Sequence, residues 1–152
     1  MIVGIKMRGF TLLELMVGVA IVAILATLAV PSFVEQIKRD RIVTHANQMQ
    51  AVYRFARSEA VKRETAIELR AAQSSWKVIE LVNGREIELR SFTPSHSSIQ
   101  IAFPTLQIKK TGEISAAKNV LITDNDNSTS DIRFCALPSG QSWLEAGVRG
   151  CA

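Results

Sequence analysis

The chain opens with one long apolar segment. Residues 10–30 are apolar apart from two threonines and a single charged residue, Glu14. As a helix, these 21 residues would extend about 31 Å at 1.5 Å per residue, which matches the hydrocarbon core of a bilayer. The pattern therefore predicts a transmembrane helix over residues 10–30.

The helical pattern continues beyond Pro31. Apolar residues recur at spacings of three and four, as on one face of a helix, at Ile42, Ala46, Met49, Tyr53, Ala56 and Ala60. We therefore expect residues 31–63 to form the second half of the helix and to pack against a head domain. Pro31 has no N–H to donate to the carbonyl of Thr27, so a kink is expected there.

From residue 65 the pattern changes to alternation with a period of two, which indicates strands. The expected strands cover residues 76–82, 86–90, 99–103, 106–108, 120–123 and 131–136. Asn83-Gly84 predicts a hairpin turn. A second turn is expected at residues 110–113, and residues 71–75 have the weakest pattern. The predicted fold class is α+β, with a long kinked N-terminal helix packed on an antiparallel β-sheet head over residues 64–152.

The formal charge of +4 is unevenly distributed. Residues 31–63 carry 7 basic and 3 acidic residues, whereas residues 64–152 carry 9 basic and 10 acidic ones. The strand-rich part is thus close to neutral, which weakens any argument for nucleic-acid binding from the basic pI.

Glu14 admits two interpretations. A carboxylate in hydrocarbon costs at least about 2.5 kcal/mol, so in a plain anchor Glu14 would lie near one bilayer face and reach the interface. Alternatively, a cut after Gly9, a small residue before the apolar segment, would give Phe10 a free amine. That amine would lie one helical turn from Glu14, on the same chain or a neighbouring one. No small-x-small cleavage site directly follows residue 30, which argues against a secretory signal.

The stretch Gly9-Phe10-Thr11-Leu12-Leu13-Glu14 resembles the processing motif of type IV pilins and type II secretion pseudopilins. The resemblance implies that residues 1–9 are a leader held in the cytoplasm. A prepilin peptidase would cut between Gly9 and Phe10 and methylate the new N-terminus. Glu14 would then neutralise the amine of a neighbouring subunit during assembly.

Residues 56–63, Ala-Arg-Ser-Glu-Ala-Val-Lys-Arg, resemble the end of the helix in the GspH/FimT/FimU subfamily. This implies a minor pilin or pseudopilin that primes or caps a filament. Its expected partners are the prepilin peptidase, other pilins and inner-membrane lipid, with the head in the periplasm. The motif is common to pili and to secretion systems, so both remain open.

Cys135 and Cys151 are the two cysteines of the chain. In an oxidising periplasm they are expected to form a disulfide. A bond that closes the loop between residues 135 and 151 would stabilise the folded state by about 3 kcal/mol in the chain-entropy model.

The sequence offers no constellation that would support catalysis, a cofactor or a metal. His45 and His96 are isolated. Residues 124–128 look like the start of a calcium loop, but Thr129 and Cys135 stand where Gly and Glu are required. We therefore expect a structural subunit and not an enzyme.

A DNA-binding minor pilin for natural transformation is the alternative function. DNA-binding relatives of the FimT type carry a C-terminal Gly-Arg-x-Arg motif, whereas residues 140–143 here are Gly-Gln-Ser-Trp. DNA binding would require other cations to converge, namely Arg133, Arg149, Lys109 and Lys110. The missing arginines argue against DNA as a partner.

Overall fold

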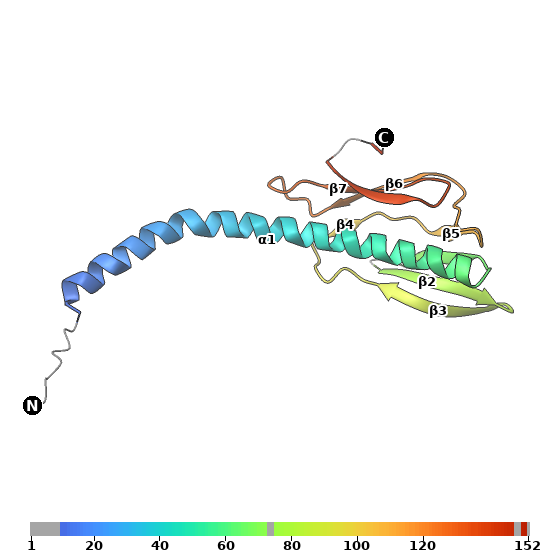
Figure 1. Ribbon diagram of the computed structural model, residues 1–152, viewed down its shortest axis with the longest axis horizontal. Coiled ribbons are helices and arrows are strands. Elements are labelled where there is room, and N and C mark those ends of the chain that lie inside the picture. The colour runs from blue at the N-terminus through green and yellow to red at the C-terminus, as the bar shows by residue number, and fades with distance from the viewer. Residues whose placement is uncertain (1–9, 73–74, 148–149, 152) are drawn as a thin grey trace, which may run out of the picture. The chain divides into compact units, whose positions relative to one another are not determined.

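The computed structural model describes residues 10–72, 75–147 and 150–151 (Figure 1). One helix, α1 (Leu12–Lys62), is followed by eight strands in the described residues. The strands are β1 (Ile67–Ala72), β2 (Ser75–Val82), β3 (Arg85–Phe92), β4 (Gln100–Ile101), β5 (Leu106–Ile108), β6 (Lys118–Thr123), β7 (Ile132–Ala136) and β8 (Ser142–Ala146). The chain divides into an N-terminal unit, Met1–Ile37, and a head unit, Lys38–Ala152.

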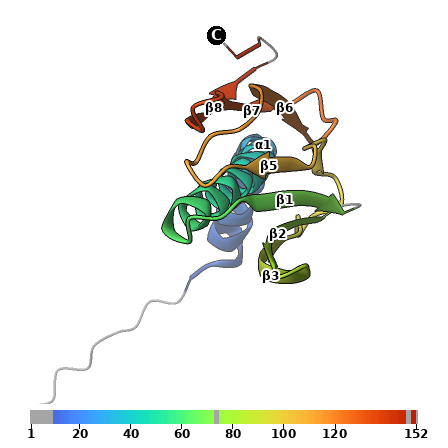
Figure 2. The same ribbon diagram turned by 90° about the vertical axis from the view of Figure 1, so that its right-hand side faces the viewer.

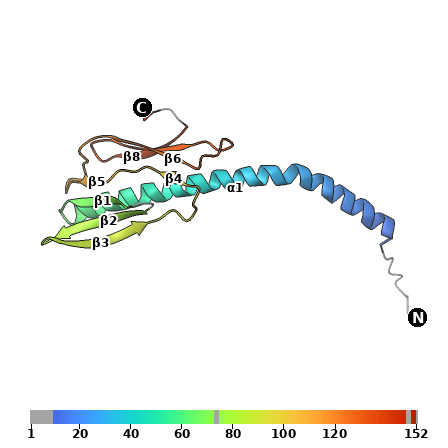
Figure 3. The same cartoon turned by 180° about the vertical axis from the view of Figure 1, so that it is seen from behind.

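The strands of the head unit form two four-stranded sheets. Sheet A has the order β3-β2-β1-β5, and sheet B has the order β4-β6-β7-β8. Every pairing is antiparallel. Seen along the helix, its green C-terminal turns lie against both sheets (Figure 2), and the view from behind agrees (Figure 3). The predicted α+β class with an antiparallel head is confirmed, and its strands are divided between two sheets.

Two strands were not predicted. Strand β1 includes Ala71 and Ala72, which lie in the stretch with the weakest pattern. Strand β8 begins at Ser142, within the stretch that was compared only with the Gly-Arg-x-Arg motif. Both strands are specified by their partners. Ile67 and Leu69 of β1 pair with Glu80 and Val78 of β2, so a short, weakly patterned segment is held by strands on each side.

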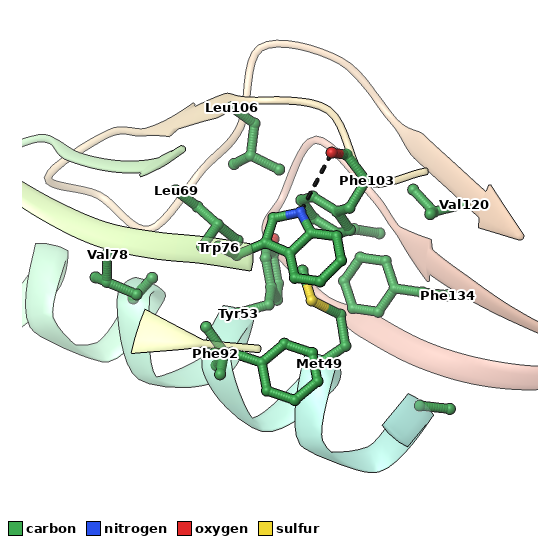
Figure 4. Packing of buried hydrophobic residues seen from close by; sticks show 14 of the residues in the cluster. Met49, Tyr53, Leu69, Trp76, Val78, Phe92, Phe103, Leu106, Val120 and Phe134 are labelled. Carbon is green, nitrogen blue, oxygen red and sulfur yellow. Dashed lines mark hydrogen bonds between the residues drawn. The ribbon is translucent and has the colours of Figure 1, made fainter. Parts of the chain in front are cut away.

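The predicted apolar stripe of α1 is the centre of the core. Ile42, Ala46, Met49, Tyr53, Ala56 and Ala60 are all fully buried. Aromatic side chains from both sheets meet the stripe (Figure 4). The ring of Tyr53 contacts Phe134 of β7 edge-on at 5.2 Å, and Trp76 stacks on Phe92 at 5.6 Å. One helix face therefore fills the space between two sheets.

Local hydrogen bonds and residues at positive φ end α1 and join β2 to β3. The helix ends in a Schellman motif, because the N–H of Thr65 donates to the carbonyl of Ala60 and that of Glu64 donates to Val61. Glu64 takes the left-handed position, with φ of 54°. The predicted Asn83-Gly84 turn joins β2 to β3, with both residues at positive φ.

The turns that contain Gly112 and Gly140 are hydrogen-bonded to side chains in the last part of α1. The Arg57 Nε–H donates to the carbonyl of Gly112 at 3.0 Å, and the Tyr53 hydroxyl donates to the carbonyl of Gly140 at 3.1 Å. A Cβ on Gly140 would lie 1.9 Å from the Gly112 oxygen, and φ at Gly140 is +81°. The approach of these two turns therefore requires glycine at position 140.

We predict that Gly140→Ala destabilises the head by at least about 3 kcal/mol, because backbone strain is added to a clash with backbone. Gly84→Ala is the matched control. Gly84 also has positive φ, but a Cβ added there would meet nothing within 4 Å, so a loss of about 1 kcal/mol is expected. Urea unfolding of a fragment covering residues 32–152 measures both, since the buried core lies within residues 42–136. Equal losses in the two variants would contradict the clash.

Candidate functional site

The start of α1 is capped by the side chain of Thr11. Thr11 precedes the helix and its hydroxyl accepts the backbone N–H of Glu14 at 3.2 Å. Thr11 and Glu14 are three residues apart, which is the spacing of the Thr-x-x-Glu capping sequence. The cap begins the helix at Leu12, so Glu14 lies in the first turn, where the helix dipole favours a negative charge.

A shallow apolar hollow of about 340 Å³ lies on the same turns. It is lined by Phe10, Glu14, Leu15, Gly18, Val19 and Val22. Phe10 before the cap and Leu15 after the first turn occupy the two positions of a hydrophobic staple. The carboxylate of Glu14 is thus the one charged group at an otherwise apolar surface.

Apolar side chains of the N-terminal unit are exposed on all sides of the helix. Phe10 is 81% exposed, and many of the aliphatic residues between positions 12 and 37 are more than half exposed. The helix contains an 18-residue window of mean hydropathy 2.5 with no buried share. Its length and composition are sufficient to cross a membrane.

Pro31 lies within the helix, which continues unbroken through it. The hydroxyl of Thr27 donates to the carbonyl of Ile24, and the hydroxyl of Ser32 donates to that of Ala29. These side chains supplement the helical hydrogen bonds on either side of the proline. A kink at Pro31 stays a prediction.

The predicted disulfide joins Cys135 of β7 to Cys151, with 5.7 Å between the Cα atoms. Cys135 is fully buried, and its Cα partners are Asn119 in β6 and Trp143 in β8. The bond therefore attaches the C-terminal segment to the central strands of sheet B.

Two family models match this chain. The model described as Type II transport protein GspH covers residues 45–143, which is more than half of the chain. The chain belongs to the GspH family. The model of the prokaryotic N-terminal methylation motif matches residues 5–30, which include Thr11 and Glu14. The chain is accordingly a minor pilin or pseudopilin of the GspH/FimT/FimU type.

Individual relatives agree with this assignment. Two fimbrial proteins of Pseudomonas aeruginosa are each 26% identical over 141 residues, which is 93% of this chain and 75% of theirs. The type IV minor pilin FimU of the same species has a similar fold, with a TM-score of 0.64 at 18% identity over 75% of this chain and 95% of the FimU chain. The minor pseudopilin EpsH of Vibrio cholerae gives 0.54 at 14% identity, over 66% and 93%.

Gly9, together with the basic residues Lys6 and Arg8 of the expected leader, lies outside the described residues. The motif match covers Gly9 by sequence. The cleavage between Gly9 and Phe10 and the methylation of Phe10 stay predictions in this GspH-family chain.

The acidic loop, defined as residues 124–131, connects β6 to β7, and the carboxylates of Asp124 and Asp126 are engaged in contacts within the head unit. Asp124 accepts the hydroxyl of Thr129 at 2.6 Å, and Asp126 accepts the N–H and the hydroxyl of Ser128. Lys38 of α1 forms an ion pair with Asp126 at 2.6 Å, and this contact holds the pKa of the carboxyl well below its usual value. No cluster of three metal-binding side chains is present among the described residues.

His45 is buried between the helix and the loop that follows β3. The N–H of Ser95 donates to its Nε2 at 3.2 Å, which leaves Nδ1 to donate to the carbonyl of Arg41 at 2.7 Å. His45 thus holds the loop between β3 and β4 against the helix. No periodicity or motif marks this role in the sequence.

The four cations considered for DNA lie on different elements. Arg133 is in β7 and donates to Asn119 at 2.8 Å, whereas Lys109 and Lys110 lie in the turn after β5, with Lys109 paired to Glu113. Arg149 lies outside the described residues. DNA binding through these cations stays an untested alternative.

We predict that replacing both cysteines by serine lowers the free energy of unfolding by about 3 kcal/mol, because the reduced chain gains loop entropy when unfolded. Urea unfolding of the oxidised and reduced wild-type protein provides the matched comparison. Coincident midpoints for the two forms would contradict a stabilising bond.

Proposed function

We propose that this chain is a minor structural subunit of a type IV pilus or a type II secretion pseudopilus, and not an enzyme. After the cut between Gly9 and Phe10, residues 10–30 hold it in the inner membrane, residues 31–63 continue the helix, and the head lies in the periplasm. The subunit then joins a periplasmic or surface filament, where it primes or caps assembly.

The position of Glu14 is the observation that carries the proposal. It is the one acidic residue within residues 10–30, and it lies in the first helical turn beside the apolar hollow that begins at Phe10. Placing this carboxylate in hydrocarbon is unfavourable by itself. A cationic amine on the Phe10 of a neighbouring chain would offset that cost, and only cleavage after Gly9 makes this amine available.

The exposed apolar helix supplies the remaining driving force. Apolar side chains around the whole circumference of residues 12–30 can pack against lipid before assembly and against other helices afterwards. Replacing lipid contacts by contacts with other helices requires no change in the head, because the buried core lies within residues 42–136.

We predict that Glu14→Val leaves cleavage largely intact but reduces incorporation into filaments by on the order of tenfold or more, because the neighbouring amine loses its counter-charge. Incorporation is measured by immunoblotting sheared or overproduced filaments, and cleavage by mass. Glu35→Val is the matched control, since it removes a carboxylate from the same helix beyond residue 30. It should assemble normally.

Processing has its own control. Gly9→Leu should leave the precursor uncut, so that its mass is larger than that of the processed protein by the mass of the leader.

Normal assembly of Glu14→Val would refute the amine pairing. Deleting the gene and scoring surface pili and secreted protein in the same strain tells which of the two machines the subunit serves.

A further inference from the structure

Strand β8 is an edge of sheet B. The sheet has the order β4-β6-β7-β8, so β8 pairs with β7 on one side and with no other described strand (Figure 2). No backbone hydrogen bond joins its other side to a described residue. Such an edge presents a row of backbone N–H and C=O groups to which a strand of another chain can bond.

The hydrogen bonds at the two ends of β8 show which backbone groups are free. The N–H of Leu137 donates to the carbonyl of Gln141, and the N–H of Gly147 donates to the carbonyl of Asp131. Both bonds follow the register of the β7–β8 pair, so the odd-numbered residues of β8 bond to β7. The even-numbered residues direct their N–H and C=O groups to the open edge, namely Ser142, Leu144 and Ala146.

The other three sheet edges in the described residues are protected against pairing. Four of the eight residues of β3 are charged, and β4 has only two residues. Strand β5 has three residues, and Ile108 already forms a bridge with Ile114 on its outer side. Charges, short strands and covered edges are the usual protection of native sheets. Strand β8, with five residues and a single charge at Glu145, has none of these features.

Both faces of β8 suit an added strand. Leu144 packs against the core, so an aliphatic residue beside it would extend the buried surface. On the opposite face, Glu145 forms no salt bridge with a described residue, so a basic residue across from it would be favourable. A groove of about 1070 Å³ beside the start of β8, lined in part by Ser58, Val61 and Ser142, leaves room for inward-facing side chains.

We propose that β8 receives an extended segment of a different filament subunit, which pairs with it as an added strand of sheet B. The segment is expected to be about five residues long, with aliphatic side chains facing the core and a basic one opposite Glu145. This inference rests on the proposed function, since it names the head contact of a minor subunit.

A second copy of this chain does not supply the added strand. Subunits that enter a filament from one membrane point the same way, so their contacts join different surfaces. The β8 edge of one copy would then have to meet β3, β4 or β5 of another, and these edges are charged, short or covered. A single open edge therefore fits a subunit with one neighbour of another kind, and does not repeat along a filament.

The test places a photocrosslinker in the edge strand of the full chain, in its own bacterium. Trp143, on the opposite face of β8 from Leu144, is replaced by p-benzoylphenylalanine, which is also a large aromatic residue. Irradiation and mass spectrometry should identify a crosslink to a strand-forming segment of another pilin or pseudopilin. The same probe at Ile87, which is 44% exposed in the edge strand β3, is the matched control and should not give this crosslink.

Ala146→Pro tests the strand pairing itself. Proline removes the N–H that Ala146 directs to the open edge and removes no hydrogen bond to β7. The crosslink from position 143 should fall by on the order of tenfold in Ala146→Pro and stay at its original level in Ala146→Ser. Urea unfolding of the full chain in detergent should give the same midpoint for both variants. If the midpoints differ, Glu145→Lys decides, because it leaves the backbone unchanged and should also reduce the crosslink.

Three results would overturn the proposal. They are a crosslink to a second copy of this chain, a crosslink from position 143 no stronger than that from position 87, and equal crosslinks in Ala146→Pro and Ala146→Ser. A chain that is absent from filaments but gives the expected crosslink would refute the filament role and leave the β8 contact intact. A chain that assembles in a Glu14-dependent way without the crosslink would refute only the β8 contact.

Discussion

The head unit depends on the packing of one helix face against two sheets. The described residues of the head contain no second helix, so the inner faces of both sheets are covered by the stripe from Ile42 to Ala60. Alanines at positions 46, 56 and 60 let the sheets approach the helix closely, whereas Met49 and Tyr53 fill the centre of the core. Burial of these side chains supplies the main stabilising term, and the disulfide and the glycine turns add to it.

The same helix meets a different requirement in the N-terminal unit. There its apolar residues surround the axis, and none of the hydropathy window that could span a membrane is buried. The helix is capped by the hydroxyl of Thr11, which accepts the N–H of Glu14, so the residue that carries the lone charge lies in the first turn. In the proposed function, assembly uses that charge only after cleavage has created its partner.

Sequence reasoning was most successful for features that a local pattern specifies or that only a few residues can form. The six-residue stripe of α1, the Asn83-Gly84 turn and the cysteine pair were all predicted and are confirmed. Reasoning was weakest for β1 and β8, which are short and are specified by pairing with distant strands. Residues 138–140, Pro-Ser-Gly, are a turn signal that could have placed a strand after them. This stretch was instead compared only with the Gly-Arg-x-Arg motif, which it lacks.

The sequence by itself determined the membrane-length apolar helix, the lone carboxylate of Glu14 within it, the helix face that forms the core and the α+β class. These features are local, because they depend on the spacing of side chains along a single helix or on alternation within a strand. Only the tertiary structure decided the division into two sheets, the burial of His45 and the close approach of the turns at Gly112 and Gly140. Each of these joins residues far apart in the chain, and no periodicity within one segment records such a contact.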